Sequence, residues 1–297
     1  MNYFNEELMK ELPESLNKYD HHAVQDAIYF PSISNHEYHN SAGVSSSTIR
    51  KFAVSELHAV KEEVEQTPAL RFGSAAHSYI VEGEKAFSQD VAIISGSMYS
   101  AANKDIIAEC QDKGITCIAQ KDFENIKAMS ENLLPYADKL LHPYENDYPN
   151  DVFNYPYERA LYWWEGEVLC KLKADVIRYP DIPMHDSKDL IVVDYKTTKS
   201  CNPDAFLGSI KQYGYHYQAA WYARGFKKAG FNVKEFVFVA QEKTTPYATK
   251  VFKINTNNLD KYWTELEYTL GNYESYIQKG EQSLQAYNSP DVIELDI

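Results

Sequence analysis

The sequence predicts an α/β fold, with a mixed central sheet flanked by helices and helical additions at both ends. Helical apolar spacing fills much of residues 44–141, strand-like alternation begins after residue 151, and another helical segment separates the later strands. No repeat or Gly/Ser-rich linker interrupts the 297 residues, so we expect one domain. Its parts would be an N-terminal helix and loop (1–43), a core (44–254) and an acidic C-terminal helix (255–297).

The first half of the chain is predicted to be mainly helical. We expect an amphipathic helix at 4–18, followed by a loop at 19–43. Several possible N-caps, Ser45 to Thr48, precede a helix over 48–65. After a turn at Thr67-Pro68, the remaining elements are a helix from Arg71 to Val81 that ends near Gly83, helices at 102–113 and 121–141, and a short strand at 114–119.

The second half changes to strands. Two of them are predicted around a turn at Glu165-Gly166, and a polar loop at 180–188 leads to a third. The predicted elements, in order, are strands Tyr157–Trp164, Glu167–Tyr179 and Asp189–Thr198, a helix at 203–229, strands Phe236–Gln241 and Thr249–Ile254, and an acidic, Tyr-rich helix at 257–287.

Charge and composition narrow the functional classes. The net charge of −14 argues against a nucleic-acid partner, but residues 151–230 hold 11 Lys/Arg against 10 Asp/Glu, so the acidity lies elsewhere. No apolar run is long enough to cross a membrane, and the acidic start lacks the features of a secretion signal. We therefore expect a cytoplasmic protein. The four cysteines have no CxxC spacing, which disfavours a zinc knuckle or a disulfide framework.

Two adjacent strands carry the candidate chemistry. Because side chains alternate along a strand, Asp194 and Lys196 share one face at the polar end of an apolar strand. On the preceding strand, one face carries Lys171, Lys173 and Asp175. The other face is apolar and carries the even-numbered residues from Val168 to Val176. If the strands pair through the 180–188 connection, Asp175 and Asp194 converge beside lysines.

Two carboxylates and a lysine form a plausible phosphodiesterase site. Carboxylate oxygens suit Mg²⁺, which can bridge to a phosphate and activate a water. Lys196 would hold that water and contact the phosphate. The alternative is an exposed strand with an Asp–Lys pair of little energetic consequence.

Two helical segments add to this pattern. Gly73 and His77 lie at i,i+4 on one helix, where the imidazole could become a metal ligand, although a histidine on an Ala-rich helix is more often a core or surface residue. Gln218 and Tyr222 have the same spacing on the helix after the proposed site. They could position Lys196 or a DNA phosphate, or form the polar edge of a packed helix.

These pieces, in this order, resemble the PD-(D/E)XK nuclease superfamily in its RecB-like branch. More narrowly, they resemble the exonuclease VIII (RecE) family of prophages, over about residues 29–245. The matching segments are Ile33–His39, Val44–Ile49, Leu70–His77, Leu169–Asp175, Val193–Thr198 and Ser209–Tyr222. The superfamily's Pro-Asp is Ala174-Asp175 here, and the iron–sulfur cysteines of some RecB-like relatives are missing.

The resemblance implies a restriction-endonuclease-like sheet and a metal-dependent deoxyribonuclease. It implies Mg²⁺, replaceable by Mn²⁺, held by His77, Asp175, Asp194 and the backbone carbonyl of Tyr195, with Lys196 as the catalytic lysine. Members of the family digest the 5′ strand of linear double-stranded DNA from its ends. They leave 3′ overhangs for a single-strand annealing protein of the RecT type, and they form rings around DNA.

Further residues are candidates for lesser roles. Glu158 and Glu167 flank the first site strand and could add a carboxylate to the metal, or could lie on a solvated edge. The helix start at Ser45–Ser47 could receive a DNA phosphate through its backbone N–H groups, or could simply be capped. The candidate DNA contacts are Ser47, Arg50, Lys51, Arg71 and Lys173.

Other functions fit the same residues. A nuclease of this fold could be an endonuclease or a CRISPR-adaptation nuclease, since a fold does not fix polarity or the need for an end. A non-catalytic DNA-end binding subunit is the alternative from another class. To reconcile the negative charge with DNA binding, we expect a homo-oligomeric ring whose channel gathers Lys171, Lys173, Lys196, Lys199 and Lys211.

Overall fold

A seven-stranded sheet forms the centre of the computed structural model, which describes residues 1–297 except 1–11, 32, 63–65, 144–156, 181–187 and 288–297. The strand order is β1-β2-β5-β6-β7-β8-β9. β7 and β8 pair in parallel and the other neighbours are antiparallel, so the sheet is mixed, as predicted. The strands are β1 (His22–Val24), β2 (Ala27–Phe30), β5 (Tyr157–Glu165), β6 (Val168–Arg178), β7 (Asp189–Thr198), β8 (Asn232–Glu242) and β9 (Thr249–Ile254).

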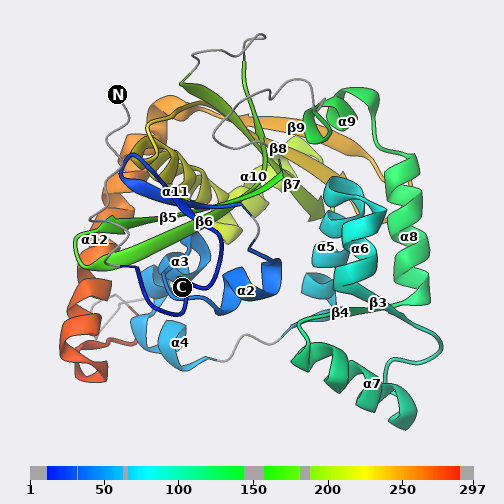
Figure 1. The fold of residues 1–297 in the computed structure, drawn as a ribbon. Helices are drawn as coiled ribbons and strands as arrows, with labels where there is room; N and C mark the ends of the chain where they lie inside the picture. The colour runs from blue at the N-terminus through cyan, green and yellow to red at the C-terminus, as the bar shows by residue number, and fades with distance from the viewer. Residues whose placement is uncertain (1–11, 32, 63–65, 144–156, 181–187, 288–297) are drawn as a thin grey trace, which may run out of the picture.

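One face of this sheet is covered by helices from both halves of the chain. The largest apolar cluster joins the strands to α3 through Ile49, to α10 through Phe206, to α11 through Trp221 and to α12 through Leu266. Figure 1 shows α11 and α12 together beside β5 and β6. These helices are α3 (Ser46–Val54), α10 (Pro203–Tyr213), α11 (Tyr215–Lys228) and α12 (Leu259–Lys279), and α4 (Glu56–Lys61) follows α3.

The opposite face has two separate covers. A second apolar cluster packs Ala76 and Met129 against Val193 and Val237 of the sheet, so this cover lies over β6 to β8. A third cluster joins residues near the N-terminus and Tyr38 of α2 (Asn35–Asn40) to β5 and β6. The first cover consists of α5 (Pro68–His77), η1 (Ser78–Glu82), α6 (Glu84–Asp90), α7 (Ala101–Asp112), α8 (Gln120–Glu131), α9 (Pro135–Leu141) and the parallel pair β3 (Val91–Ile94) and β4 (Thr116–Ala119).

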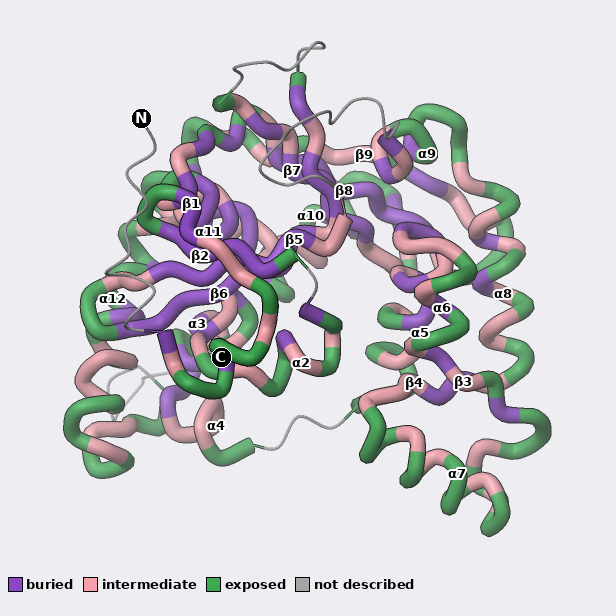
Figure 2. The backbone as a smooth tube through the Cα atoms, in the orientation of Figure 1, coloured by how far each residue is buried: buried purple, intermediate pink, exposed green. Residues whose placement is uncertain are grey.

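Figures 1 and 2 show these two covers side by side, with α2 facing α5 across the space between them. The exposed residues of Figure 2 lie mainly on the outer turns of the helices, and the strands between the layers are buried. The seam between the two covers lies over β6, which contributes Val176 to the second cluster and Leu169 to the third.

Several predicted helices are in fact pairs. The helix predicted at 48–65 breaks at Ser55, whose side chain caps α4, and the one at 121–141 breaks before Pro135. The helix predicted at 203–229 breaks at Gly214, which is left-handed at φ 62°. A side-chain cap, a proline and a left-handed glycine each end a helix locally but leave the apolar periodicity of the sequence unchanged. A prediction based on periodicity alone therefore reads the two helices as one.

The N-terminal prediction is wrong in part. The loop expected at 19–43 contains β1, β2 and α2, and residues 12–18 form turns instead of a helix. The rest of that predicted helix lies outside the described residues. β1 and β2 have only three and four residues. Such short strands lack a readable alternation, and their position comes from pairing with the distant β5. The strand β3 was also not predicted.

The strands β6 and β7 form a fork. They pair as predicted, but the ladder includes only Val176 to Arg178 on β6. Beyond it β6 continues beside β5 and β7 continues beside β8. Ala174 lies in the first apolar cluster and Val176 in the second, on the other side of the sheet. The prediction that these two residues share a face is therefore wrong, because the alternation shifts around Asp175.

No helix in the described part of the chain is long and apolar enough to span a membrane.

Candidate active site

Three carboxylates from three neighbouring strands lie in a row at the fork. On β5 and β6, Tyr157 pairs with Val176 and Arg159 pairs with Ala174, so Glu158 lies opposite Asp175. On β7, Val193 pairs with Val176, so the next residue, Asp194, continues the row. Asp175 does not continue the ladder; its Oδ2 accepts a hydrogen bond of 2.8 Å from the backbone N–H of Tyr195. The predicted convergence of Asp175 and Asp194 is thus present in the structure, and Glu158 joins them.

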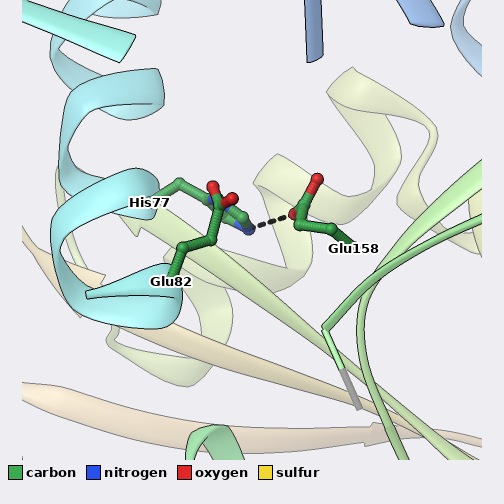
Figure 3. Close-up of side chains that lie close together, drawn as sticks. All are labelled: His77, Glu82 and Glu158. Carbon is green, nitrogen blue, oxygen red and sulfur yellow. Dashed lines mark hydrogen bonds and ion pairs between the residues drawn. The ribbon is translucent and has the colours of Figure 1, made fainter. Parts of the chain in front are cut away.

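His77 lies over this row from the end of α5. Its Nε2 is 3.2 Å from Asp175 Oδ2 and 3.5 Å from Glu158 Oε1. Its Nδ1 lies 3.3 Å from Oε1 of Glu82. Figure 3 shows the imidazole between the carboxylates of Glu82 and Glu158, which come from the helical cover and from the sheet. The imidazole therefore connects the two layers at the seam.

Glu82 is a site residue that the sequence reasoning missed. It lies five residues after His77, a spacing that an α-helix does not place on one face. The segment Ser78–Glu82 is a π-helix, in which bonds connect residues i and i+5, so Glu82 comes next to His77. The only sequence signal is a glutamate directly before Gly83, and nothing in the apolar periodicity indicates a π-helix.

Glu158 has an unusual backbone conformation. Its φ of 53° is left-handed, which costs a non-glycine residue about 1–3 kcal/mol and is frequent at functional sites. Its Oε2 is 2.7 Å from Nζ of Lys173, and the same ammonium donates a 2.8 Å hydrogen bond to Asn35 of α2. Lys173 and His77 therefore contact different oxygens of the Glu158 carboxylate and together hold it in place.

Asp194 and Lys196 form a close ion pair on the α11 side of the fork. Asp194 is fully buried, and its Oδ1 accepts a 2.6 Å hydrogen bond from Nε2 of Gln218. Nζ of Lys196 lies 5.2 Å from the ring centre of Tyr215. Gln218 thus orients Asp194 rather than Lys196 itself.

Tyr222, the other predicted helper on α11, has a structural contact. Its hydroxyl donates a 2.7 Å hydrogen bond to the backbone carbonyl of Lys173. The prediction that it positions Lys196 or a phosphate is not met by this geometry. Because Lys173 is two residues from Asp175, Tyr222 acts on the site by holding β6 against α11.

The electrostatics of the row follow from burial and from partner charges. Burial raises the pKa of Asp194 to about 6, although Lys196 opposes the shift. Burial would also raise the pKa of Asp175, but the charge and hydrogen bond of His77 outweigh it and lower that pKa. Burial disfavours the charged imidazole, yet Asp175 and its neighbours lift the pKa of His77 well above its ordinary value. The pKa of Glu158 is raised, chiefly by burial.

The donor set fits a hard divalent cation. Asp194 Oδ2 and His77 Nε2 are buried atoms whose contacts in the described part of the chain are ion pairs with Lys196 and with Asp175 and Glu158, respectively, all of them residues of the site itself. Potential ligand atoms of His77, Glu82 and Glu158 all lie within 4.8 Å of one another. Carboxylate oxygens with one imidazole suit Mg²⁺ or Mn²⁺. This cluster contains His77 and Glu158, both among the predicted metal candidates, and adds Glu82.

The second flanking glutamate, Glu167, belongs elsewhere. It lies in the β5–β6 turn at the far end of the hairpin. Its backbone N–H donates to Oε1 of Glu274, and its carboxylate accepts from Gln278, both on α12. The prediction that Glu167 could reach the metal is therefore wrong: the seven residues Val168–Ala174 of β6 separate it from Asp175.

The predicted DNA contacts have different surroundings. Ser47 and Lys51 are exposed on α3, and Arg50 donates to the Ser46 carbonyl from the same helix. Arg71 donates to the carbonyl of Gln66. Lys173 is 9% exposed and ion-paired with Glu158, an arrangement that leaves little of it for a phosphate.

Comparison with solved structures supports the fold. A crystal structure from Eubacterium rectale, named as a presumptive exonuclease, superposes with a TM-score of 0.56 at 18% identity, covering 90% of this chain and 96% of that one. A complex of Rai1 from Scheffersomyces stipitis with (3'-NADP)+ and calcium has 11% identity and a TM-score of only 0.31, covering 60% and 49%. No curated protein matches.

A family model supplies the classification. It is described as a PDDEXK-like domain of unknown function (DUF3799), and it matches residues 45–288. This range includes the four pieces noted in the sequence, from His77 to Tyr222, and the whole fork. The chain therefore belongs to the PDDEXK-like DUF3799 family.

Proposed function

We propose that this chain is a metal-dependent exodeoxyribonuclease, which degrades the 5′ strand of linear double-stranded DNA and leaves 3′ overhangs. The observation that supports it best is the row of Glu158, Asp175 and Asp194, with Lys196 paired to Asp194 at its end. The name of the Eubacterium rectale structure and the resemblance to exonuclease VIII support the exonuclease activity in particular.

The roles of the residues follow from their contacts. Asp175, Asp194 and His77, with the Tyr195 carbonyl, would hold a Mg²⁺ ion, which supplies charge neutralisation and Lewis acidity at the scissile phosphate. Lys196 keeps its proton, since the carboxylates beside it outweigh burial and raise its pKa. It is therefore suited to hold the attacking water and a phosphate oxygen by hydrogen bonds.

The supporting residues keep this geometry rigid. Gln218 fixes the orientation of Asp194 by its 2.6 Å hydrogen bond, and the Tyr195 N–H fixes Asp175. Lys173 fixes Glu158. Pre-organised ligands avoid a rearrangement during the reaction, which is a large part of electrostatic catalysis.

We also propose that the product is passed to a single-strand annealing protein of the RecT type. A 3′ overhang is the product of 5′-strand digestion, and annealing to a complementary single strand is a reaction that consumes it. Nothing in the described contacts identifies the partner surface, so this part of the proposal depends on the polarity of cleavage.

The experiment is digestion of one duplex in three forms: linear with a 5′ label, linear with a 3′ label, and closed circular. With Mg²⁺ we expect early release of the 5′ label as short products, slow shortening of the 3′-labelled strand, and no cleavage of the circle. Cleavage of the circle would indicate an endonuclease. Binding to ends without cleavage in Mg²⁺ or Mn²⁺ would indicate a non-catalytic DNA-end binding subunit and contradict the proposal.

A further inference from the structure

The break between α10 and α11 brings two tyrosine rings together. Residues two apart on a continuous helix point to different sides. Gly214 interrupts the helix with φ 62° and ψ 38°, and the rings of Tyr213 and Tyr215 come within 5.7 Å, at an angle of 31°. The left-handed backbone favours glycine at this position, and a Cβ there would also approach Cδ of Arg50 to 2.9 Å, so that the arginine side chain would have to shift.

The two rings lead from the candidate active site to the surface. Nζ of Lys196 lies 5.2 Å from the centre of the Tyr215 ring, which contacts the rings of Phe206 and Phe238 in the core. Tyr213 is 54% exposed, so one side of its ring lies open beyond Tyr215. The distance from Nζ of Lys196 to the ring centre of Tyr213 is therefore at most about 11 Å, the sum of these two separations. This length corresponds to about three nucleotides of a DNA strand.

The charges beside the rings suit a nucleotide. Lys196 lies at the inner end, and the side chain of Arg50 lies beside Gly214, the residue that joins the two tyrosines. Nη1 of Arg50 is a buried atom with no hydrogen-bond partner in the described part of the chain. Proteins that hold single nucleic-acid strands combine cations along the backbone with aromatic rings that stack on bases.

We propose that Tyr213 stacks on a nucleobase of the DNA strand whose phosphate lies at Lys196, and so positions that strand for cleavage. The Tyr213 ring packs against the partly buried ring of Tyr215, and the helix break at Gly214 determines the angle between the two rings. This inference depends on the proposed nuclease function for its substrate. Because every base has a face that can stack, the contact does not depend on the base sequence. It does require an unpaired base, such as one at a separated strand end.

The test compares Tyr213→Ala, Tyr213→Phe and Tyr213→Trp in two measurements. The first is quenching of 2-aminopurine fluorescence at the end of a single-stranded oligonucleotide, in EDTA, so that cleavage cannot occur. The second is KM and kcat for end-labelled linear duplex with Mg²⁺. Tyr268→Ala, which removes an exposed tyrosine of α12, is the matched control.

For Tyr213→Ala we expect loss of quenching and a rise in KM of about 5- to 150-fold, the range expected for one stacked base, with kcat changed less. Phe and Trp should retain both properties, and the control should match the parent chain. If Tyr213→Ala quenches and cleaves like the control, the stacking role is refuted. A parent chain that quenches normally but never cleaves would refute the nuclease function and leave the stacking role standing.

Discussion

Buried charges at the fork compensate one another, and each depends on its partner. Glu158 is held between Lys173 and His77, and Asp194 between Lys196 and Gln218. A buried ion pair contributes little net stability, but removal of one partner leaves an uncompensated charge. The site is therefore sensitive to single substitutions that would be harmless on a surface.

Lys173→Met tests whether this lysine is a structural partner or a DNA contact. Its ammonium bonds Glu158 and Asn35, so we expect a loss of about 3 kcal/mol of unfolding free energy, measured by urea denaturation. The exposed Lys104 of α7 is the matched control: Lys104→Met should leave stability within about 0.5 kcal/mol. Equal stability of the two variants, with weaker DNA binding only for Lys173→Met, would support the DNA-contact prediction instead.

Metal binding should depend on pH through Asp194. Its pKa of about 6 lies above the ordinary 3.8, so the ionised form is destabilised in the metal-free chain and protons compete with the cation. The pKa of His77 is also raised, and its proton must leave before the imidazole can bind a metal. Magnesium affinity should therefore weaken as the pH falls, beginning above 6.5 as His77 takes up its proton and continuing through about 6 as Asp194 does. Calorimetric titration at several pH values measures this, and an affinity that is constant below pH 6 would contradict it.

At the scale of secondary structure, the fork and the close packing of α11 position the site. α11 supplies Gln218 and Tyr222, and its contact with the sheet is close at Gly225. A Cβ there would lie 2.5 Å from Leu172 and 2.7 Å from Trp163, both fully buried. The helix can approach the strands only because this residue has no side chain.

Gly225→Ala should therefore destabilise the protein by about 1–3 kcal/mol, because the core must move to admit one methyl group. Gly208→Ala is the control, since its Cβ would meet nothing within 4 Å on the helix α10. Alanine should be neutral or stabilising at that position by up to about 1 kcal/mol. Urea denaturation compares the two variants. A neutral Gly225→Ala would mean that α11 does not pack as closely as described.

The elements that the sequence could predict are those with long apolar periodicity. β5, β6, β7 and β9 were predicted within a few residues, and the pairing of β6 with β7 followed from their connection. The π-helix, the left-handed Glu158 and the short strands β1 to β3 leave no such periodic pattern. They arise from tertiary contacts, and for that reason Glu82 was not predicted and Glu158 could not be distinguished from Glu167 as a candidate metal ligand.

At the scale of the whole molecule, the negative charge must be reconciled with DNA binding. The chain carries a net charge of −14, and phosphate contacts require local positive charge. Of the lysines expected to line a ring channel, Lys171 and Lys173 are buried under α2, whereas Lys199 and Lys211 are exposed. Any electropositive channel thus depends on the exposed lysines near Lys196.

A homo-oligomeric ring therefore stays a proposal, with the exposed lysines facing its channel. Sedimentation at low micromolar concentration should give a closed oligomer, and digestion should continue on bound DNA after excess unlabelled DNA is added. Enclosure would make this processivity weakly dependent on salt, although initial binding falls with salt. A monomer that releases DNA after a few nucleotides would exclude the ring without affecting the active-site assignment.

The central claim is that the row at the fork cuts DNA with a bound cation. The direct measurement is the rate of Mg²⁺-dependent nucleotide release from linear duplex by the parent chain, by Asp194→Asn and by Glu167→Gln. Asparagine keeps the shape and the bond from Gln218 but removes the charge, so we expect a loss of about 10³-fold or more. Glu167→Gln, at the far end of the hairpin, should stay within about twofold. Undiminished cleavage by Asp194→Asn, or cleavage by the parent chain without a divalent metal, would contradict the account.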